Sequence, residues 1–257
     1  MSLHNEVEFE NEVCEQLGAN GWLYSAGDAG NYDRTKALYP ADVVDWIKAT
    51  QQKSWEVVAN NHGSQAADVV VSRLRDSLNQ RGTLDVIRHG IELLGLRQPL
   101  SMAQFKPALA MNADIMARYA ANRLRVVRQV RYSVLNENCI DLVLFLNGIP
   151  VATVELKTDF TQSVNDAVDQ YRFDRIPNPK GQAPEPLLSF PGGALVHFAV
   201  STDEVRMTTR LNGAETVFLP FNLGDDGAAG NPVNPKGCRT AYLWEQVWQR
   251  DSWLEIL

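Results

Sequence analysis

The amino-acid sequence predicts an α/β (α+β) fold in which a mixed central sheet is flanked by helices and carries a helical insertion. Helical periodicity marks both ends of the 257-residue chain and dominates residues 37–121. Apolar runs of strand length follow from residue 124. Asn147-Gly148, a strong turn signal, joins two of those runs into a hairpin.

The first predicted element is a helix over residues 6–20, because Phe9, Val13 and Leu17 recur at steps of four. A short strand is expected at residues 22–25. Residues 37–121 lack strand signals, so we expect residues 1–36 and 122–257 to form the core and residues 37–121 to form a helical lobe. Breaks between its helices are predicted at His62-Gly63, Arg81-Gly82-Thr83 and Gln98-Pro99.

Strand signals return at residue 124. Apolar residues occupy alternate positions of 124–134, and Arg128 is the exception on that face. Further strands are predicted at 140–146, 151–157, 195–201, 205–211 and 216–218, with helices at 163–175 and 242–257. The last helix contains Trp244, Trp248 and Trp253, which form either core or a seam toward a further region. It ends on apolar residues without a cap, so we expect the natural polypeptide to continue.

Composition indicates a soluble globular protein with 45% hydrophobic residues. The three cysteines lie far apart and predict neither a zinc site nor a disulfide framework, which favours a cytoplasmic location. No apolar run reaches the roughly 18 residues of a membrane span. The net charge of −7 argues against a dedicated DNA-binding module, although a nuclease must itself gather carboxylates around a metal.

The predicted hairpin carries the candidate chemistry. Asp141 opens an otherwise apolar strand, and in the returning strand Glu155 and Lys157 share a face because side chains alternate. Register decides whether Asp141 joins them. A two-residue connection that pairs Leu146 with Ile149 turns Asp141 away. A three-residue connection, or a bulge equivalent to it, places Asp141 opposite Glu155.

Facing carboxylates at a buried strand end repel one another unless a cation lies between them. A hard divalent ion with oxygen ligands, above all Mg²⁺, resolves the repulsion and can polarise a phosphate. Lys157 can hold the attacking water or offset developing charge. On most strands a Glu-x-Lys sequence is an ordinary surface pair. Here an acid also lies in the preceding buried strand, where unpaired charge is rare, and this favours a catalytic role. We therefore predict phosphodiester hydrolysis with Asp141, Glu155 and Lys157 as catalytic residues.

These positions resemble the motif of the PD-(D/E)xK nuclease superfamily, with Asp141 and Glu155-Leu156-Lys157 in its places. More closely, the chain resembles the amino-terminal endonuclease domain of the restriction (R) subunit of type I restriction–modification enzymes, notably at residues 198–203 and 209–222. The resemblance implies a restriction-endonuclease-like fold and cleavage of double-stranded DNA with Mg²⁺.

The resemblance also implies roles for residues outside the hairpin. Glu10 falls where the family places an acid near the metal, which makes it a further catalytic and metal-binding candidate; a solvated helix face is the alternative. Gln170 matches a Gln-x-x-x-Tyr pattern that contacts DNA, whereas Asp174 replaces the tyrosine. Arg172 and Arg175 are candidates for phosphate contact.

By the same resemblance, a translocase region of the same polypeptide would follow residue 257, and methylation and specificity subunits would join the complex. The chain has no Gly-x-x-x-x-Gly-Lys-Ser/Thr loop, so ATP is expected to act only through the later region. The alternatives are a catalytically silent DNA-binding or assembly module of the same fold and a free-standing repair or junction nuclease.

Two further groups of residues remain open to interpretation. His197 lies in an apolar strand and is expected to be a core histidine rather than a ligand. An arginine cluster could line DNA or form a solvated strand edge; it contains Arg118, Arg123, Arg125, Arg128 and Arg131.

Overall fold

The computed structural model describes residues 2–109, 111–158 and 162–257. Its centre is a mixed sheet in the order β1-β2-β3-β4-β5-β6, in which only β3 and β4 run parallel. The predicted mixed sheet with flanking helices is thereby confirmed. The strands are β1 (Leu124–Arg131), β2 (Cys139–Leu146), β3 (Ile149–Leu156), β4 (Val196–Val200), β5 (Val205–Thr208) and β6 (Leu219–Pro220).

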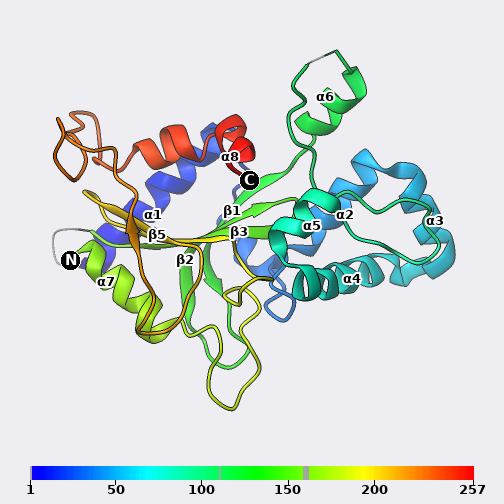
Figure 1. The fold of residues 1–257 in the computed structure, drawn as a ribbon, viewed down its shortest axis with the longest axis horizontal. Helices are drawn as coiled ribbons and strands as arrows, with labels where there is room; N and C mark the ends of the chain where they lie inside the picture. Colours follow the sequence, from blue (N-terminus) through cyan, green and yellow to red (C-terminus); the bar gives the residue numbers. More distant parts are fainter. Residues whose placement is uncertain (1, 110, 159–161) are drawn as a thin grey trace.

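Helices cover the sheet on both faces. Figure 1 shows α1 and α8 on one side of the strands, α7 on the other, and α2 to α5 gathered at one end. No helix in the described ranges has the length and apolar character needed to traverse a bilayer. The helices are α1 (Ser2–Ala19), η1 (Asp28–Asn31), α2 (Pro40–Thr50), α3 (Gln52–His62), η2 (Gly63–Gln65), α4 (Ala66–Arg81), α5 (Thr83–His89), α6 (Ala113–Ala120), α7 (Val164–Asp169), η3 (Gln170–Asp174), η4 (Leu243–Val247) and α8 (Arg250–Ile256).

Two main hydrophobic cores lie on the two faces of the sheet, and a small third cluster joins α7 to Ala199 of β4. The larger core joins Phe9 of α1, Trp46 of α2 and Leu74 of α4 to Leu144 of β2, so the helices of residues 37–121 share one core with the sheet. The smaller core lies on the opposite face. Because each strand of the central hairpin is covered on both faces, its sequence is nearly continuously apolar.

The α1 helix follows its predicted apolar stripe. Phe9, Val13 and Leu17 are buried in the larger core. Glu10 follows Phe9 directly and is only 3% exposed, so the solvated-face alternative for this acid is wrong. A buried carboxylate in a helix needs partners or a changed charge state, and the site described below provides both.

Other elements depart from their predicted bounds. Residues 22–25 form only a single parallel bridge, from Leu23 to Arg125, instead of a strand. The strand expected at 216–218 is displaced to β6, because residues 212–216 close a turn through Thr216. The terminal helix is divided into η4 and α8.

The tryptophans of these last two helices belong to the core. Trp244, Trp248 and Trp253 are each no more than 2% exposed. The ring of Trp244 packs against Phe9 of α1, and the rings of Trp248 and Trp253 pack against Phe198 of β4. Of the two alternatives for this segment, the structure therefore supports core packing.

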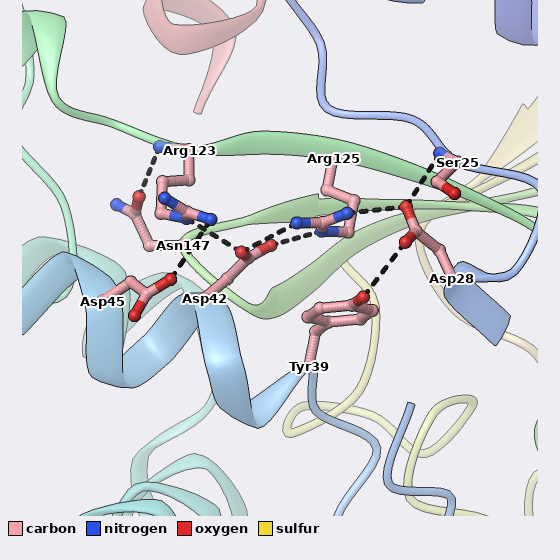
Figure 2. Close-up of polar contacts among 8 residues, drawn as sticks. All are labelled: Ser25, Asp28, Tyr39, Asp42, Asp45, Arg123, Arg125 and Asn147. Carbon is pink, nitrogen blue, oxygen red and sulfur yellow. Dashed lines mark hydrogen bonds and ion pairs between the residues drawn. The ribbon is translucent and has the colours of Figure 1, made fainter. Parts of the chain in front are cut away.

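A buried ionic network fixes the start of β1 to α2 and η1 (Figure 2). Asp42 is fully buried and accepts from Arg123 Nε at 2.8 Å and from Arg125 Nε at 2.6 Å. Arg125 Nη1 also donates to Asp28 Oδ2 at 2.6 Å, and Tyr39 donates to the other oxygen of Asp28. These two arginines of the predicted basic cluster therefore pair with internal acids.

Candidate active site

The site begins with a bulge in the β2–β3 hairpin. Next to the turn Leu146 pairs with Ile149, as a two-residue connection requires. The register then shifts so that Leu142 pairs with Val154, and its continuation by one residue places Asp141 opposite Glu155. The extra residue is Val151 of β3. The predicted bulge is thus confirmed, and the two acids project to one face.

Glu155 is fully buried at the end of β3. Its Oε1 accepts from Arg175 Nε at 2.6 Å, whereas its Oε2 has no hydrogen-bond partner among the residues that the structure describes. Burial and the negative charge of Asp141 raise the pKa of Glu155 well above its usual range, against the opposing effect of Arg175. The facing acid is itself an acceptor, so it can satisfy Oε2 only through a shared proton or a cation.

Asp141 is held by the backbone of the opposite strand. Its Oδ2 accepts from the Leu156 amide at 2.7 Å, a bond that fixes the carboxylate beside Glu155. The side chain is partly exposed, in contrast to Glu155. One acid of the pair is therefore open to solvent or substrate, and the other lies behind it.

Glu10 of α1 joins this pair from a distant part of the sequence. Arg128 Nη2 donates to its Oε2 at 3.0 Å, and Gln129 Nε2 donates to its Oε1 at 2.7 Å. Burial and the charge of Asp141 raise the pKa of Glu10 to about 7 despite the arginine. The structure thus brings together all three acids expected from the sequence, and it explains Arg128 on an apolar face as the partner of Glu10.

Lys157 follows β3 directly, two positions beyond Glu155. Its backbone amide donates to the Val200 carbonyl at 2.8 Å, which extends the parallel pairing with β4 by one residue. Its side chain is 8% exposed, and Nζ lies 3.6 Å from Glu6 Oε1 of α1. The ammonium group is therefore largely desolvated and has an acid beside it.

The helix after β3 supplies an unexpected partner for Glu155. Ser163 begins α7 with a capping box to Asp166, as a Ser-x-x-acid sequence predicts. Arg175 follows η3, the segment after α7, and is buried; besides Glu155 it donates to the Cys139 carbonyl at 2.7 Å. The sequence predicted that Arg175 meets DNA phosphate, but the structure gives it a role at the buried acid.

The other residues expected to contact DNA lie on the same helix. Arg172 donates through Nε and Nη2 to the Thr216 carbonyl, and about a third of its side chain remains exposed. Gln170 has a buried side-chain oxygen without a partner in the described ranges, and Asp174 is exposed. Nothing in the geometry tests their contact with DNA, which stays a prediction.

A buried polar chain connects this helix to β3 and β4. Thr153 Oγ1 is 2.8 Å from the Tyr171 hydroxyl and 2.7 Å from His197 Nδ1. Burial lowers the pKa of His197 to about 3, so the ring is neutral at physiological pH. The expected core histidine is confirmed, and through Tyr171 it stabilises the helix that carries Arg175.

The carboxylates partly fit a divalent cation. Within the described ranges no three acidic, histidine or cysteine side chains form a group that could hold a metal. Mg²⁺, however, usually binds through one or two carboxylates and completes its shell with water and substrate phosphate. Asp141 and the unpartnered Oε2 of Glu155 match that requirement, and a cation there would relieve the repulsion that raises the pKa of Glu155.

Comparison with known proteins adds independent information. The profile of a family described as type I restriction enzyme R protein N terminus matches residues 5–216. The matched range begins ahead of Glu10 and includes the hairpin, Lys157 and the helix with Arg175. No curated protein matches the chain.

Proposed function

Because this chain belongs to the family of type I restriction enzyme R protein N termini, we propose that it is a Mg²⁺-dependent endonuclease domain. In this proposal it hydrolyses phosphodiester bonds of double-stranded DNA within an ATP-dependent restriction complex. The carrying observation is the bulged hairpin, which sets Asp141 opposite Glu155. One buried carboxylate oxygen of Glu155 also has no donor among the residues that the structure describes.

In the proposed mechanism, Asp141 and Glu155 hold the metal. Protein contacts fix both carboxylates: the Leu156 amide donates to Asp141, and Arg175 donates to Glu155. When bound, the cation would polarise the scissile phosphate and stabilise the leaving oxygen. Glu10 places a third carboxyl group beside Asp141, and oxygen ligands of this kind are what a hard divalent ion such as Mg²⁺ prefers.

Lys157 is proposed to act on the phosphate and on the attacking water. Its ammonium group is a compact charge with donors that can contact a phosphate oxygen or the water. Because the group is largely desolvated, its charge stabilises a developing negative charge more strongly than an exposed lysine would. Glu6 keeps the ammonium near the strand end until substrate arrives.

DNA delivery is proposed to come from the rest of the assembly. Methylation and specificity subunits and a translocase region of the same polypeptide would supply recognition and ATP-driven movement. The net charge of −7 and the pairing of Arg123 and Arg125 with Asp42 and Asp28 support this division, because fewer uncompensated basic side chains are left to bind the DNA backbone.

The test replaces Asp141 by Asn, Glu155 by Gln or Lys157 by Met in the complete restriction complex. Cleavage should fall by at least about 100-fold in each variant, while DNA binding and ATPase activity persist. Asp68→Asn is the matched control, because this acid is exposed on α4 and is none of the residues of the proposed site. Unchanged cleavage in all three variants would refute the proposal and favour a catalytically silent module.

A further inference from the structure

Gln129 lies in the middle of β1 with a left-handed backbone. Its φ of 52° is unusual for a residue with a long side chain, which is about 1–2 kcal/mol less stable in this region than in a right-handed or extended one. The neighbours on both sides keep their pairing to β2, Arg128 with Leu142 and Val130 with Ile140. The distortion is therefore confined to one residue, which lies opposite Asp141.

This backbone change alters which side chains of β1 share a face. Val126 packs in the larger core, whereas Val127 and Val130, three positions apart, both pack in the smaller core. A regular strand would place Val127 and Val130 on opposite faces. The backbone change at Gln129 therefore lets Val127 and Val130 pack in the same core. It leaves the Gln129 side chain beside Glu10 and Asp141.

The carboxamide of Gln129 bridges two of those acids. Nε2 donates to Glu10 Oε1 at 2.7 Å and approaches Asp141 Oδ1 at 3.5 Å. The bond to Glu10 is the stronger one, and a primary amide has two N–H groups with which to serve both carboxylates. Gln129 thus connects an acid of α1 to an acid of β2, elements that are far apart in the sequence.

We propose that Gln129 is a positioning residue of the proposed metal site, which holds Glu10 and Asp141 beside one another through its side-chain amide. The inference rests on the proposed function. Arg128 already pairs with Glu10 Oε2 at 3.0 Å, so a second cation at position 129 would neutralise the acids further and compete with the metal for their charge. Gln129 orders the two carboxylates and leaves their charge available.

The experiment measures Mn²⁺ affinity by isothermal titration calorimetry and unfolding in urea, both on the 257-residue chain. Gln129→Leu keeps most of the side-chain volume but removes both N–H donors. Gln129→Gly removes the donors too, and it relieves the cost of a side chain on a left-handed backbone. Both variants should bind Mn²⁺ about 10–100-fold more weakly. The glycine variant should nevertheless match or exceed the wild-type midpoint in urea.

Gln52→Leu is the matched control. Gln52 also donates to a glutamate, Glu56, but it lies on the exposed surface of α3, so its replacement should leave Mn²⁺ affinity unchanged. If the wild type binds Mn²⁺ and both Gln129 variants bind it within about twofold, the positioning role is wrong and the proposed function survives. If only the leucine variant weakens binding and it also lowers stability, Gln129 is merely structural. Failure of the wild type to bind Mn²⁺ would instead overturn the proposed function.

Discussion

Replacement of Arg175 by methionine removes the only cation that contacts the buried Glu155 among the described residues. Two short hydrogen bonds would be lost, to Glu155 at 2.6 Å and to the Cys139 carbonyl at 2.7 Å. A charged hydrogen bond contributes about 1.5–3 kcal/mol, and a broken buried pair costs about 3–5 kcal/mol. We therefore expect Arg175→Met to lower the free energy of unfolding by about 3–5 kcal/mol.

Urea unfolding at neutral pH, followed by circular dichroism, measures this change. The double variant Glu155→Gln/Arg175→Met removes the unpaired acid together with its partner, so it should recover at least about 2 kcal/mol relative to the single arginine variant. Saturating Mn²⁺ should also stabilise the single variant, because bound metal would replace the missing cation. A single-variant effect below about 1 kcal/mol, or strictly additive effects in the cycle, would show that Arg175 does not hold Glu155.

Two further predictions concern the stability of regions outside the candidate active site. His197 has a folded pKa of about 3, below its ordinary value, so between about pH 6.5 and pH 3 the unfolded chain binds more protons and stability falls as the pH drops. When the free energy of unfolding from urea titrations is plotted against pH, the wild type should show a slope up to about 1.4 kcal/mol per pH unit steeper than His197→Asn in that window. Equal slopes in the two proteins would contradict the assignment. Asp42→Asn should lower the free energy of unfolding by about 3–5 kcal/mol by urea titration, because it leaves Arg123 and Arg125 without their buried partner. Asp45→Asn, which alters an exposed pair with the same Arg123, should cost under about 1 kcal/mol, and similar losses in the two variants would argue against the buried network.

Local patterns in the sequence predicted most of the fold. The four-residue steps of Phe9, Val13 and Leu17 correctly placed α1, and the apolar runs placed β2 and β3 to within two residues. The terminal segment could not be predicted as well. Its apolar periodicity continues through Trp248, but in the structure a side-chain bond from Gln249 to the Trp244 carbonyl accompanies a break between η4 and α8.

The candidate site was likewise predictable only in part. Alternation along a strand suffices to put Glu155 and Lys157 on one face, and register restricts Asp141 to one of two arrangements. The partners of the acids are not local: Arg175 reaches Glu155 across 20 positions and Gln129 reaches Glu10 across 119. The sequence marked Arg128 only as an exception on an apolar face, and the structure shows that this arginine pairs with Glu10.

The bulge at Val151 also constrains how this hairpin can vary. Residues that face one another across a two-residue turn are always an odd number of positions apart, but Asp141 and Glu155 are 14 positions apart. The mismatch in parity means that one extra residue must be absorbed somewhere between the two acids. Related chains should therefore change the length of this hairpin by two residues at a time, or exchange the bulge for a three-residue turn. A one-residue insertion between Asp141 and Glu155 that keeps both the two-residue turn and the bulge would turn one acid away from the other.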